Sequence, residues 1–299
     1  MASVRLDRST QINGWLFIAP ALVLLGLFLI YPILWSLWMS FQVGKGLNFH
    51  FGGFDNIIRL THDPVFIRAL VNTCIFFFVQ VPIMITLALL FAVALDDATL
   101  KLRGLFRTAI FLPCVTSLVA YSVLFKSMFA SDGVINHALM FVHLIGAPIP
   151  WLTDPFWAKV VIILAITWRW TGYNMVFYLA ALQNIDRSIY ESARIDGIPA
   201  RARFFHLTIP MLKPVILFTT VISTIGTLQL FDEVYNITQL GGPSDATLTL
   251  SLYIYNLTFR FMPNYGYSAT VSYVIVVIVA ILSAIQFFLA RDRQPRRRP

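Results

Sequence analysis

Polar side chains recur at helical spacing near residue 230 in an otherwise apolar stretch. They are Gln229, Asp232, Glu233 and Asn236. The spacing i, i+3, i+4, i+7 places all four on one face of a continuous α-helix, with Phe231 and Tyr235 beside them. Carboxylates and amides can exchange hydrogen bonds with sugar hydroxyls, and flat aromatic rings cover the apolar faces of pyranose rings. The pattern therefore predicts the lining of a cavity that takes an uncharged sugar better than an ion.

An earlier cluster mixes aromatic rings with one cation. Its members are Trp168, Arg169, Trp170, Tyr173 and Asn174. A cation at the centre of a membrane helix costs about 2.5–3.5 kcal/mol, so we expect Arg169 to have a partner. That partner is either Asp232 or Glu233, or a backbone carbonyl. We predict that Trp170, Tyr173 and Asn174 line the same pathway. The alternative is that Asp232 and Glu233 lie at the outer end of their helix, where water satisfies them.

The elements that position these residues must cross a membrane. Of 299 residues, 58% are hydrophobic and only 12% are charged, whereas an average soluble domain has about 25% charged residues. This composition excludes a soluble enzyme and a disordered scaffold. The formal net charge of +8 is typical of the cytoplasmic side of a membrane protein, so we expect no nucleic-acid partner.

Six segments are long and apolar enough to span a bilayer. We expect these spans at about residues 14–40, 69–95, 105–129, 156–182, 214–237 and 267–290. The fold is then an all-α polytopic membrane protein. Its N-terminal segment is 1–13, its transmembrane domain 14–290, its fourth loop about 183–213 and its basic tail 291–299. The apolar run at 246–259 is short for a span, and we expect an interfacial or re-entrant helix there.

Orientation follows from the lysines and arginines. The N-terminus, the second and fourth loops and the tail carry 15 of them, and the opposite loops carry only Lys45, Arg59 and Arg260. Because positive residues concentrate in the cytoplasm, both termini are expected to be cytoplasmic. Six spans agree with that arrangement.

The fourth loop carries signals for two short helices. Ser188 followed by Glu191 three residues later predicts a capping box at a helix start. Gly197 suits the left-handed residue that ends such a helix. A second helix is expected to begin at Pro199 and to stop at Pro210. From its residues alone, this loop is either a docking surface or a stretch that lies on acidic membrane lipid through its arginines.

The loop resembles the EAA loop of ABC-transporter permeases, written EAA-x3-G-x9-I-x-L-P. The matching residues are Glu191, Ser192 and Ala193, then Gly197, then Leu207, Thr208, Ile209 and Pro210. The chain departs from the motif at Ser192, Leu207 and Ile209, all small or apolar changes. Segments 194–197, 232–243 and 247–256 are similar to maltose-transporter-type permeases of carbohydrate importers, and within these to lactose and oligosaccharide systems.

The resemblance implies a type I ABC importer permease in the bacterial inner membrane, a multi-pass protein. Its EAA loop would form a coupling helix on a homodimeric cytoplasmic ATPase. The coupling residues that it implies are Glu191, Ser192, Ala193, Asp196, Gly197, Arg201, Leu207 and Pro210. It further implies a second homologous permease, which shares or holds the sugar site, and an extracytoplasmic sugar-binding protein.

Enzymatic chemistry is not expected of this chain. It has no G-x-x-x-x-G-K-[ST] run, so ATP–Mg is expected on the partner ATPase, with no catalytic residue and no cofactor here. Cys74 and Cys114 lie in apolar runs, and we expect no metal site. The alternative function is an ion- or proton-coupled secondary carrier that uses Asp232, Glu233 and Arg169.

Overall fold

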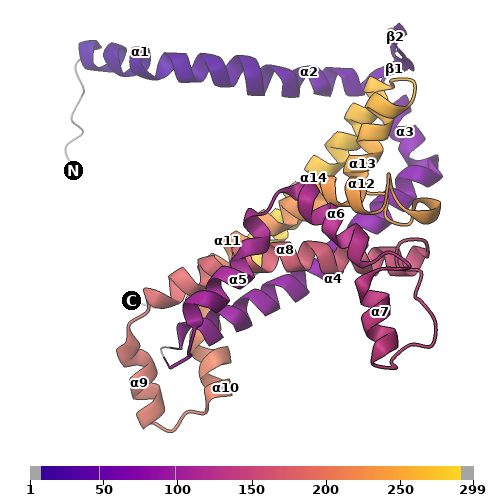
Figure 1. Cartoon of the computed structure of the whole chain (residues 1–299). Helices are drawn as coiled ribbons and strands as arrows, with labels where there is room; N and C mark the ends of the chain where they lie inside the picture. Colours follow the sequence, from indigo (N-terminus) through magenta and orange to yellow (C-terminus); the bar gives the residue numbers. More distant parts are fainter. Residues whose placement is uncertain (1–7, 47, 98, 291–299) are drawn as a thin grey trace. The chain divides into compact units, whose positions relative to one another are not determined.

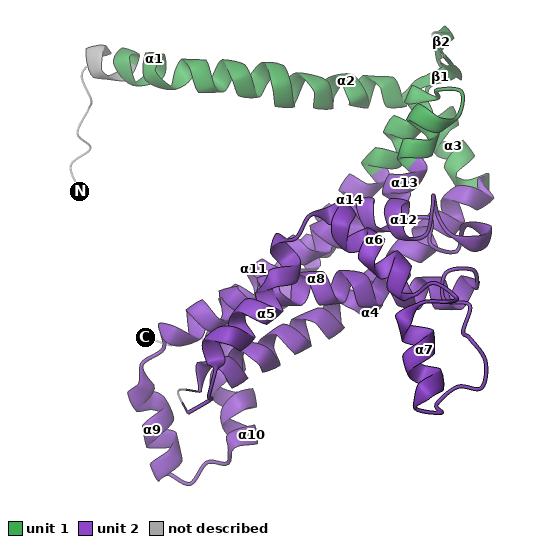
Figure 2. Cartoon of the chain, viewed as in Figure 1, with its two compact units in different colours: residues 1–62, 254–273 green, residues 63–253, 274–299 purple. Residues whose placement is uncertain are grey.

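The computed structural model describes residues 8–46, 48–97 and 99–290, with side chains from residue 12 onward. The tail 291–299 and residues 1–7 of the predicted N-terminal segment lie outside the described residues. The chain divides into two compact units (Figure 2), and each is described by itself. Unit 1 comprises residues 1–62 and 254–273, and unit 2 comprises residues 63–253 and 274–299.

Unit 1 begins with an apolar helical rod. Helix α1 (Arg8–Leu25), the π-helical turn η1 (Gly26–Ile30) and α2 (Tyr31–Ser40) follow one another in line (Figure 1). The candidate span within this rod runs from Ile12 to Ser40, and none of its most apolar window is buried. Its apolar side chains are therefore available to lipid or to another chain.

A short β-hairpin follows the rod, in a chain whose other described elements are helical as expected. Strand β1 covers Gln42–Lys45, β2 covers Asn48–Phe51, and α3 covers Asp55–His62. The strands are antiparallel, with Lys45 opposite Asn48. Gly46, in the turn between the strands, has φ +65°, a conformation open mainly to glycine, and this freedom permits the tight reversal. Asn56 of α3 fixes the hairpin by donating hydrogen bonds to Ser40 O (3.0 Å) and Gln42 O (2.8 Å).

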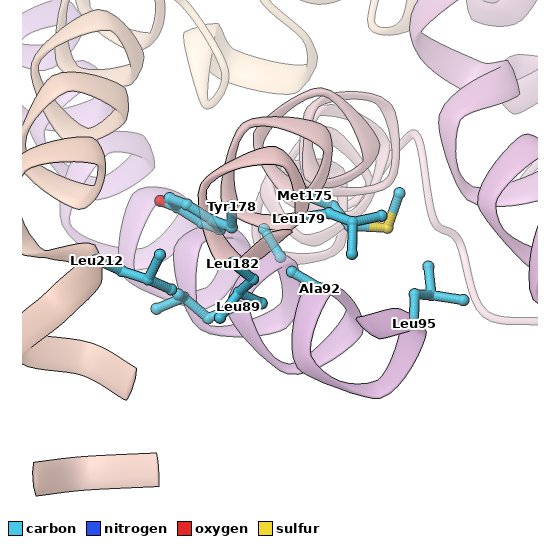
Figure 3. Packing of buried hydrophobic residues seen from close by; sticks show 9 residues of the cluster. Leu89, Ala92, Leu95, Met175, Tyr178, Leu179, Leu182 and Leu212 are labelled. Carbon is cyan, nitrogen blue, oxygen red and sulfur yellow. The ribbon is translucent and has the colours of Figure 1, made fainter. Parts of the chain in front are cut away.

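Unit 2 is built on three long helices. These are α4 (Pro64–Asp96), α8 (Pro155–Gln183) and α11 (Ile209–Leu228). Asp63 and Asp154 cap α4 and α8 by accepting hydrogen bonds from backbone N–H groups of the first turn. Figure 3 shows the core where the helices meet: Ala88, Leu89, Ala92, Leu95, Met175, Tyr178, Leu179, Leu182 and Leu212.

The third predicted span, 105–129, is wrong as a single helix. The structure has α5 (Arg103–Val115) and α6 (Leu118–Met128), bent by 101° at Thr116 and Ser117. Pro113 lies in the last turn of α5, where its ring and missing N–H disturb the helical bonds. The carbonyls exposed by the bend need donors from elsewhere in the unit.

The fifth predicted span, 214–237, is wrong at both ends. Helix α10 (Ala200–Arg203) and the π-helical turn η2 (Phe204–Thr208) lead directly into α11. Pro210 does not stop this run, because the π turn before it already places a backbone bond from Ile209 N–H to Phe204 O. The helix ends at Leu228.

Shorter elements complete the chain. They are α7 (Val134–Phe141), α9 (Arg187–Ile195), α12 (Asp232–Ile237), η3 (Pro243–Asp245), α13 (Leu250–Tyr255) and η4 (Asn256–Arg260), followed by the long α14 (Tyr265–Ala290). The described part of the chain has five helices able to span a membrane, or six if α5 and α6 form one broken span. The run at 246–259 is not among them.

Candidate functional site

Helix α9 and the turn after it form an elbow, defined here as residues 186–198. It projects from one end of the unit 2 bundle (Figure 1). Its N-cap is Asp186, whose Oδ1 accepts a hydrogen bond from Ser188 N (2.9 Å); the expected Ser188–Glu191 capping box is wrong. This backbone N–H, and then the Ser188 hydroxyl, hold the pKa of the Asp186 carboxyl below its usual value.

Gly197 closes the elbow as expected. Its φ is +73°. The N–H of Gly197 donates to Arg194 O (3.0 Å) and the N–H of Ile198 donates to Ala193 O (3.0 Å), which together make a Schellman motif. A side chain at Gly197 would strain this left-handed residue.

Three contacts fix the elbow to the chain that follows it. Tyr190 Oη and Thr208 Oγ1 share a hydrogen bond of 3.1 Å. Arg203 Nη1 donates to Ile198 O at 2.8 Å. Ala193 is buried, at the base of a groove of about 380 Å³ that Leu207 also lines. The elbow therefore has one defined conformation although most of its surface is exposed.

Of the residues predicted to contact an ATPase, five lie on this elbow (Glu191, Ser192, Ala193, Asp196 and Gly197), and Arg201, Leu207 and Pro210 lie on the segment that follows it. Exposed members are Glu191, Ser192, Asp196, Gly197, Arg201 and Pro210, whereas Leu207 is half-buried and Ala193 is buried. Ser192, Asp196 and Leu207 line the groove. One further residue was missed by sequence analysis: Ile195 is 86% exposed at the tip of α9, and an apolar residue beside the motif was the available signal.

The predicted polar face near residue 230 does not form on one helix. Gln229 is the C-cap of α11, and α12 starts only at Asp232. Thr249 Oγ1 donates to Leu230 O (2.7 Å) and so satisfies a carbonyl at the break. Glu233 is buried, whereas Gln229 and Asp232 are exposed. The premise of a continuous helical face was therefore wrong, and a role in the pathway stays a prediction.

Phe231, Tyr235 and Asn236 complete that predicted set. The rings of Phe231 and Tyr235 are stacked, with centroids 5.5 Å apart. Asn236 Nδ2 donates to Asp232 O (2.7 Å) within α12, so this amide supports the short helix. The aromatic pair keeps a flat surface of the kind that the sequence predicts.

Arg169 donates hydrogen bonds to backbone carbonyls. Its Nη1 donates to Thr116 O (3.1 Å) and more weakly to Pro113 O (3.4 Å). Its guanidinium carbon lies 4.8 Å from the centroid of the Tyr121 ring, a cation–π distance. The arginine is buried, and it supplies the donors that the bend between α5 and α6 requires. Backbone carbonyls are therefore its hydrogen-bonded partners, and Glu233 interacts with it electrostatically.

Glu233 reaches the same region from α12, which packs against α6 and α8. Its carboxylate interacts electrostatically with Tyr121 and Arg169. Tyr121 is almost fully buried and was not singled out from the sequence, where one tyrosine in an apolar run gives no signal. A buried carboxylate, a cation and a phenol thus meet at the bend.

An aromatic stripe runs along one side of α8. Trp170 and Tyr173 make an edge contact at 5.7 Å, Tyr173 and Phe177 another at 5.0 Å, and Phe177 lies 5.8 Å from Phe218 of α11. Trp170 is exposed, and Tyr173 and Phe177 are half-buried. The spacing i, i+3, i+7 could have identified Phe177. Phe218 could not be placed without the packing of α11 on α8.

Asn174 turns away from this stripe into the core. Its Nδ2 donates to Trp170 O (3.0 Å) and contacts Met84 Sδ (3.5 Å). Gln80 also reaches Met84 Sδ and accepts a hydrogen bond from Thr227 Oγ1 (3.1 Å). These buried groups join α4, α8 and α11. The structure therefore separates Asn174 from Trp170 and Tyr173.

Metal chemistry has no candidate cluster in the described ranges 8–46, 48–97 and 99–290, where no group of three histidine, cysteine or carboxylate side chains could hold an ion. Cys74 and Cys114 are free thiols. The elbow and the aromatic stripe are therefore the two features with the form of functional surfaces.

The comparisons with known proteins agree with this geometry. Residues 61–298 match the family described as binding-protein-dependent transport system inner membrane component. The lactose transport system permease protein LacF of Rhizobium radiobacter is 67% identical over 97% of each chain. The arabinooligosaccharides transport system permease protein AraP of Bacillus subtilis (strain 168) is 32% identical over 94% of this chain and 90% of its own.

The fold also matches solved structures. A chain of a bacterial alginate ABC transporter, in complex with its alginate pentasaccharide-bound periplasmic protein, gives a TM-score of 0.82 at 24% identity over 95% of each chain. A chain of a bacterial ABC transporter that imports alginate gives 0.83. This likeness confirms the expected type I importer permease fold. By sequence and by fold, the chain belongs to the inner membrane components of binding-protein-dependent transport systems.

Proposed function

We propose that this chain is a permease subunit of an ABC importer for a disaccharide or small oligosaccharide in a bacterial inner membrane. The observation that carries the proposal is the elbow, an exposed helix closed by Gly197 and fixed to the start of α11. Its support is the 67% identity to a lactose transport permease. Both features are expected of a subunit that a separate motor protein must move.

The elbow is proposed to seat on a homodimeric cytoplasmic ATPase, which binds ATP–Mg. Exposed Ile195 would add apolar area, while Glu191 and Arg201 would add polar contacts at the rim. Exposed ion pairs contribute only about 0–1 kcal/mol each, so apolar burial and the fixed shape of the elbow would dominate the affinity. Closure of the ATPase would then move α8 and α11, between which the elbow lies.

Half of the sugar pathway is proposed to lie on this chain. Trp170 and Tyr173 supply ring faces for pyranose rings, and exposed Gln229 and Asp232 supply hydrogen-bonding groups. A second, homologous permease would complete the pathway, and an extracytoplasmic sugar-binding protein would deliver the sugar. Arg169, which donates hydrogen bonds at the bend between α5 and α6, is proposed to have a structural role and no place in an ion relay.

Reconstitution tests the proposal. The chain is placed in vesicles with its homologous permease and ATPase, and uptake of labelled lactose is measured with the sugar-binding protein outside and ATP inside. We expect uptake only with all components. Uptake by this chain alone, abolished by an uncoupler and indifferent to ATP, would instead establish a secondary carrier.

A cross-linking experiment tests whether the elbow contacts the ATPase. Ile195→Cys, at a position 86% exposed, should cross-link to the ATPase in the assembled complex. Phe141→Cys, at a position 83% exposed on α7, is the matched control and should not. Equal yields from both positions would contradict the proposed contact.

A further inference from the structure

Unit 2 has a second groove at the end opposite to the elbow. It has a volume of about 510 Å³ and lies where α4 and α8 begin, with Ser244 on its edge. Helix α8 has 29 residues, so the two ends are about 43 Å apart at 1.5 Å per residue. That distance is the full thickness of a bilayer with its headgroups. With the elbow seated on the ATPase, the groove lies at the opposite membrane surface, and this step rests on the proposed function.

Two cations line this groove, Arg68 from α4 and Lys159 from α8. Arg68 Nη1 donates to Ser244 O (2.8 Å), which fixes the guanidinium beside the groove. Lys159 is half-buried, and no described residue forms a hydrogen bond or an ion pair with its ammonium. A partly desolvated ammonium without a counter-charge favours an anionic ligand.

No carboxylate among the described residues lines this groove. Asp63 caps α4 and accepts a hydrogen bond from Tyr253 Oη, and Asp154 caps α8. Asp245 follows Ser244 but does not line the groove. The two charged side chains that line the groove are therefore both cations, although cations are disfavoured on this side of a membrane protein.

Apart from Asn72 and Ser244, the remaining walls are apolar. Ile67 and Val71 lie one turn apart on α4, line the groove and are exposed. Apolar walls beside two cations, at the depth of a membrane surface, match one chemistry: a phosphate with hydrocarbon attached. We infer that this groove binds the headgroup of an anionic phospholipid, with its phosphate at Arg68 and Lys159 and an acyl chain along Ile67 and Val71.

Native mass spectrometry of the full-length chain in detergent tests the inference. The probes are dioleoyl phosphatidylglycerol, dioleoyl phosphatidylcholine and soluble glycerol 3-phosphate. We expect the phosphatidylglycerol to bind about thirtyfold more tightly than the phosphatidylcholine, about fivefold for each cation. The soluble phosphate should bind far more weakly than the lipid. Tight binding of glycerol 3-phosphate would assign the groove to a free anion and overturn the inference.

Substitutions locate the site. Arg68→Gln with Lys159→Gln should remove the preference for phosphatidylglycerol. Lys126→Gln, a cation in the last turn of α6 that does not line the groove, should keep it. Lys159→Gln alone should lower the preference about fivefold and leaves the Arg68–Ser244 hydrogen bond intact, so it remains informative if the double variant misfolds. An equal loss with Lys126→Gln would overturn the site.

Binding of a protein in this groove would give a different result in these measurements. If the double variant keeps its lipid preference but binds the sugar-binding protein less tightly, the groove is a protein contact and the inference fails. None of these measurements depends on transport, so they are separate from the test of the proposed function.

Discussion

The elbow at residues 186–198 and the bend around Arg169 achieve defined geometry in opposite ways. The cap and the Schellman closure of the elbow join residues no more than five apart in the chain. The hydrogen bonds that Arg169 donates at the bend reach Thr116 and Pro113, which lie 53 and 56 positions away in the chain. A local motif can be moved as a unit without unfolding, whereas a bend held by tertiary contacts depends on the whole bundle.

The largest effect is expected at the bend. Arg169→Met should remove the donor to Thr116 O, with Glu233 still buried nearby, whereas Pro113 O keeps its hydrogen bond from the Thr116 hydroxyl. Losing a charged partner from a buried group typically costs about 3–5 kcal/mol. We expect a large fall in the thermal unfolding temperature of the purified chain, together with loss of uptake.

A second substitution on α8 gives the control for the bend. Val176→Ala removes an exposed apolar side chain of the same helix without removing a carbonyl donor, and it should destabilise the chain less. If Arg169→Met unfolds at the same temperature as the unsubstituted chain, the bend is not held by tertiary hydrogen bonds and the contrast with the elbow fails.

The elbow should respond without global destabilisation. Gly197→Ala forces a side chain into a left-handed residue at a cost of about 1–2 kcal/mol, so the ordered elbow becomes about fivefold to thirtyfold less favoured. We expect uptake and ATPase stimulation to fall by a similar factor while the unfolding temperature changes little. Gly226→Ala is the matched control, because that glycine is helical with open space around it. A large drop in unfolding temperature for Gly197→Ala would remove the distinction.

A smaller effect is expected on the aromatic stripe. Trp170→Ala removes a ring that packs edge-on against Tyr173, and aromatic contacts contribute about 0.5–1.5 kcal/mol beyond buried area. Uptake affinity should fall about twofold to tenfold, with assembly of the complex unchanged. Leu164→Ala, at an exposed position of the same helix, should leave affinity unaltered. Unchanged uptake for Trp170→Ala would exclude this ring from the pathway.

The smallest effect tests how the elbow is attached. Tyr190→Phe removes the hydrogen bond to Thr208, which typically contributes about 0.5–1.5 kcal/mol. Trypsin cleavage at exposed Arg201 should accelerate about twofold to tenfold, because the elbow separates from η2 more often. Tyr31→Phe, at an exposed tyrosine of α2, serves as the control, and equal cleavage rates for both variants would show that the hydroxyl is not part of the attachment.

The same contrast explains what could be predicted from the sequence. The elbow was predictable because Gly197 and its neighbours encode it locally, although Asp186, whose carboxylate accepts from the Ser188 N–H, displaced Ser188 as the cap. Pro82 and Pro113 look alike in the sequence, yet α4 continues through Pro82 and the third span bends after Pro113. The donors from Arg169 arrive from another helix, and local sequence does not reveal them.

The interrupted fifth span has a similar cause. Apolar and polar residues continue in helical register from Gln229 to Asn236, so periodicity alone favours one helix. The structure ends α11 at Leu228 and satisfies Leu230 O with the hydroxyl of Thr249, 19 residues later in the chain. Buried Glu233 consequently faces the bend, while Asp232 stays exposed.

The π turn η2 sets the direction in which the side chains of α11 point around the helix axis. A π turn contains one residue more than an α-helical turn, so it rotates everything after Thr208 by about 100° around the helix axis. If Phe204–Thr208 wound as plain α-helix without losing a residue, Leu212 would point away from the core and Phe218 away from Phe177. Removing one residue from the turn would instead let the segment wind as α-helix with both side chains still directed as they are now.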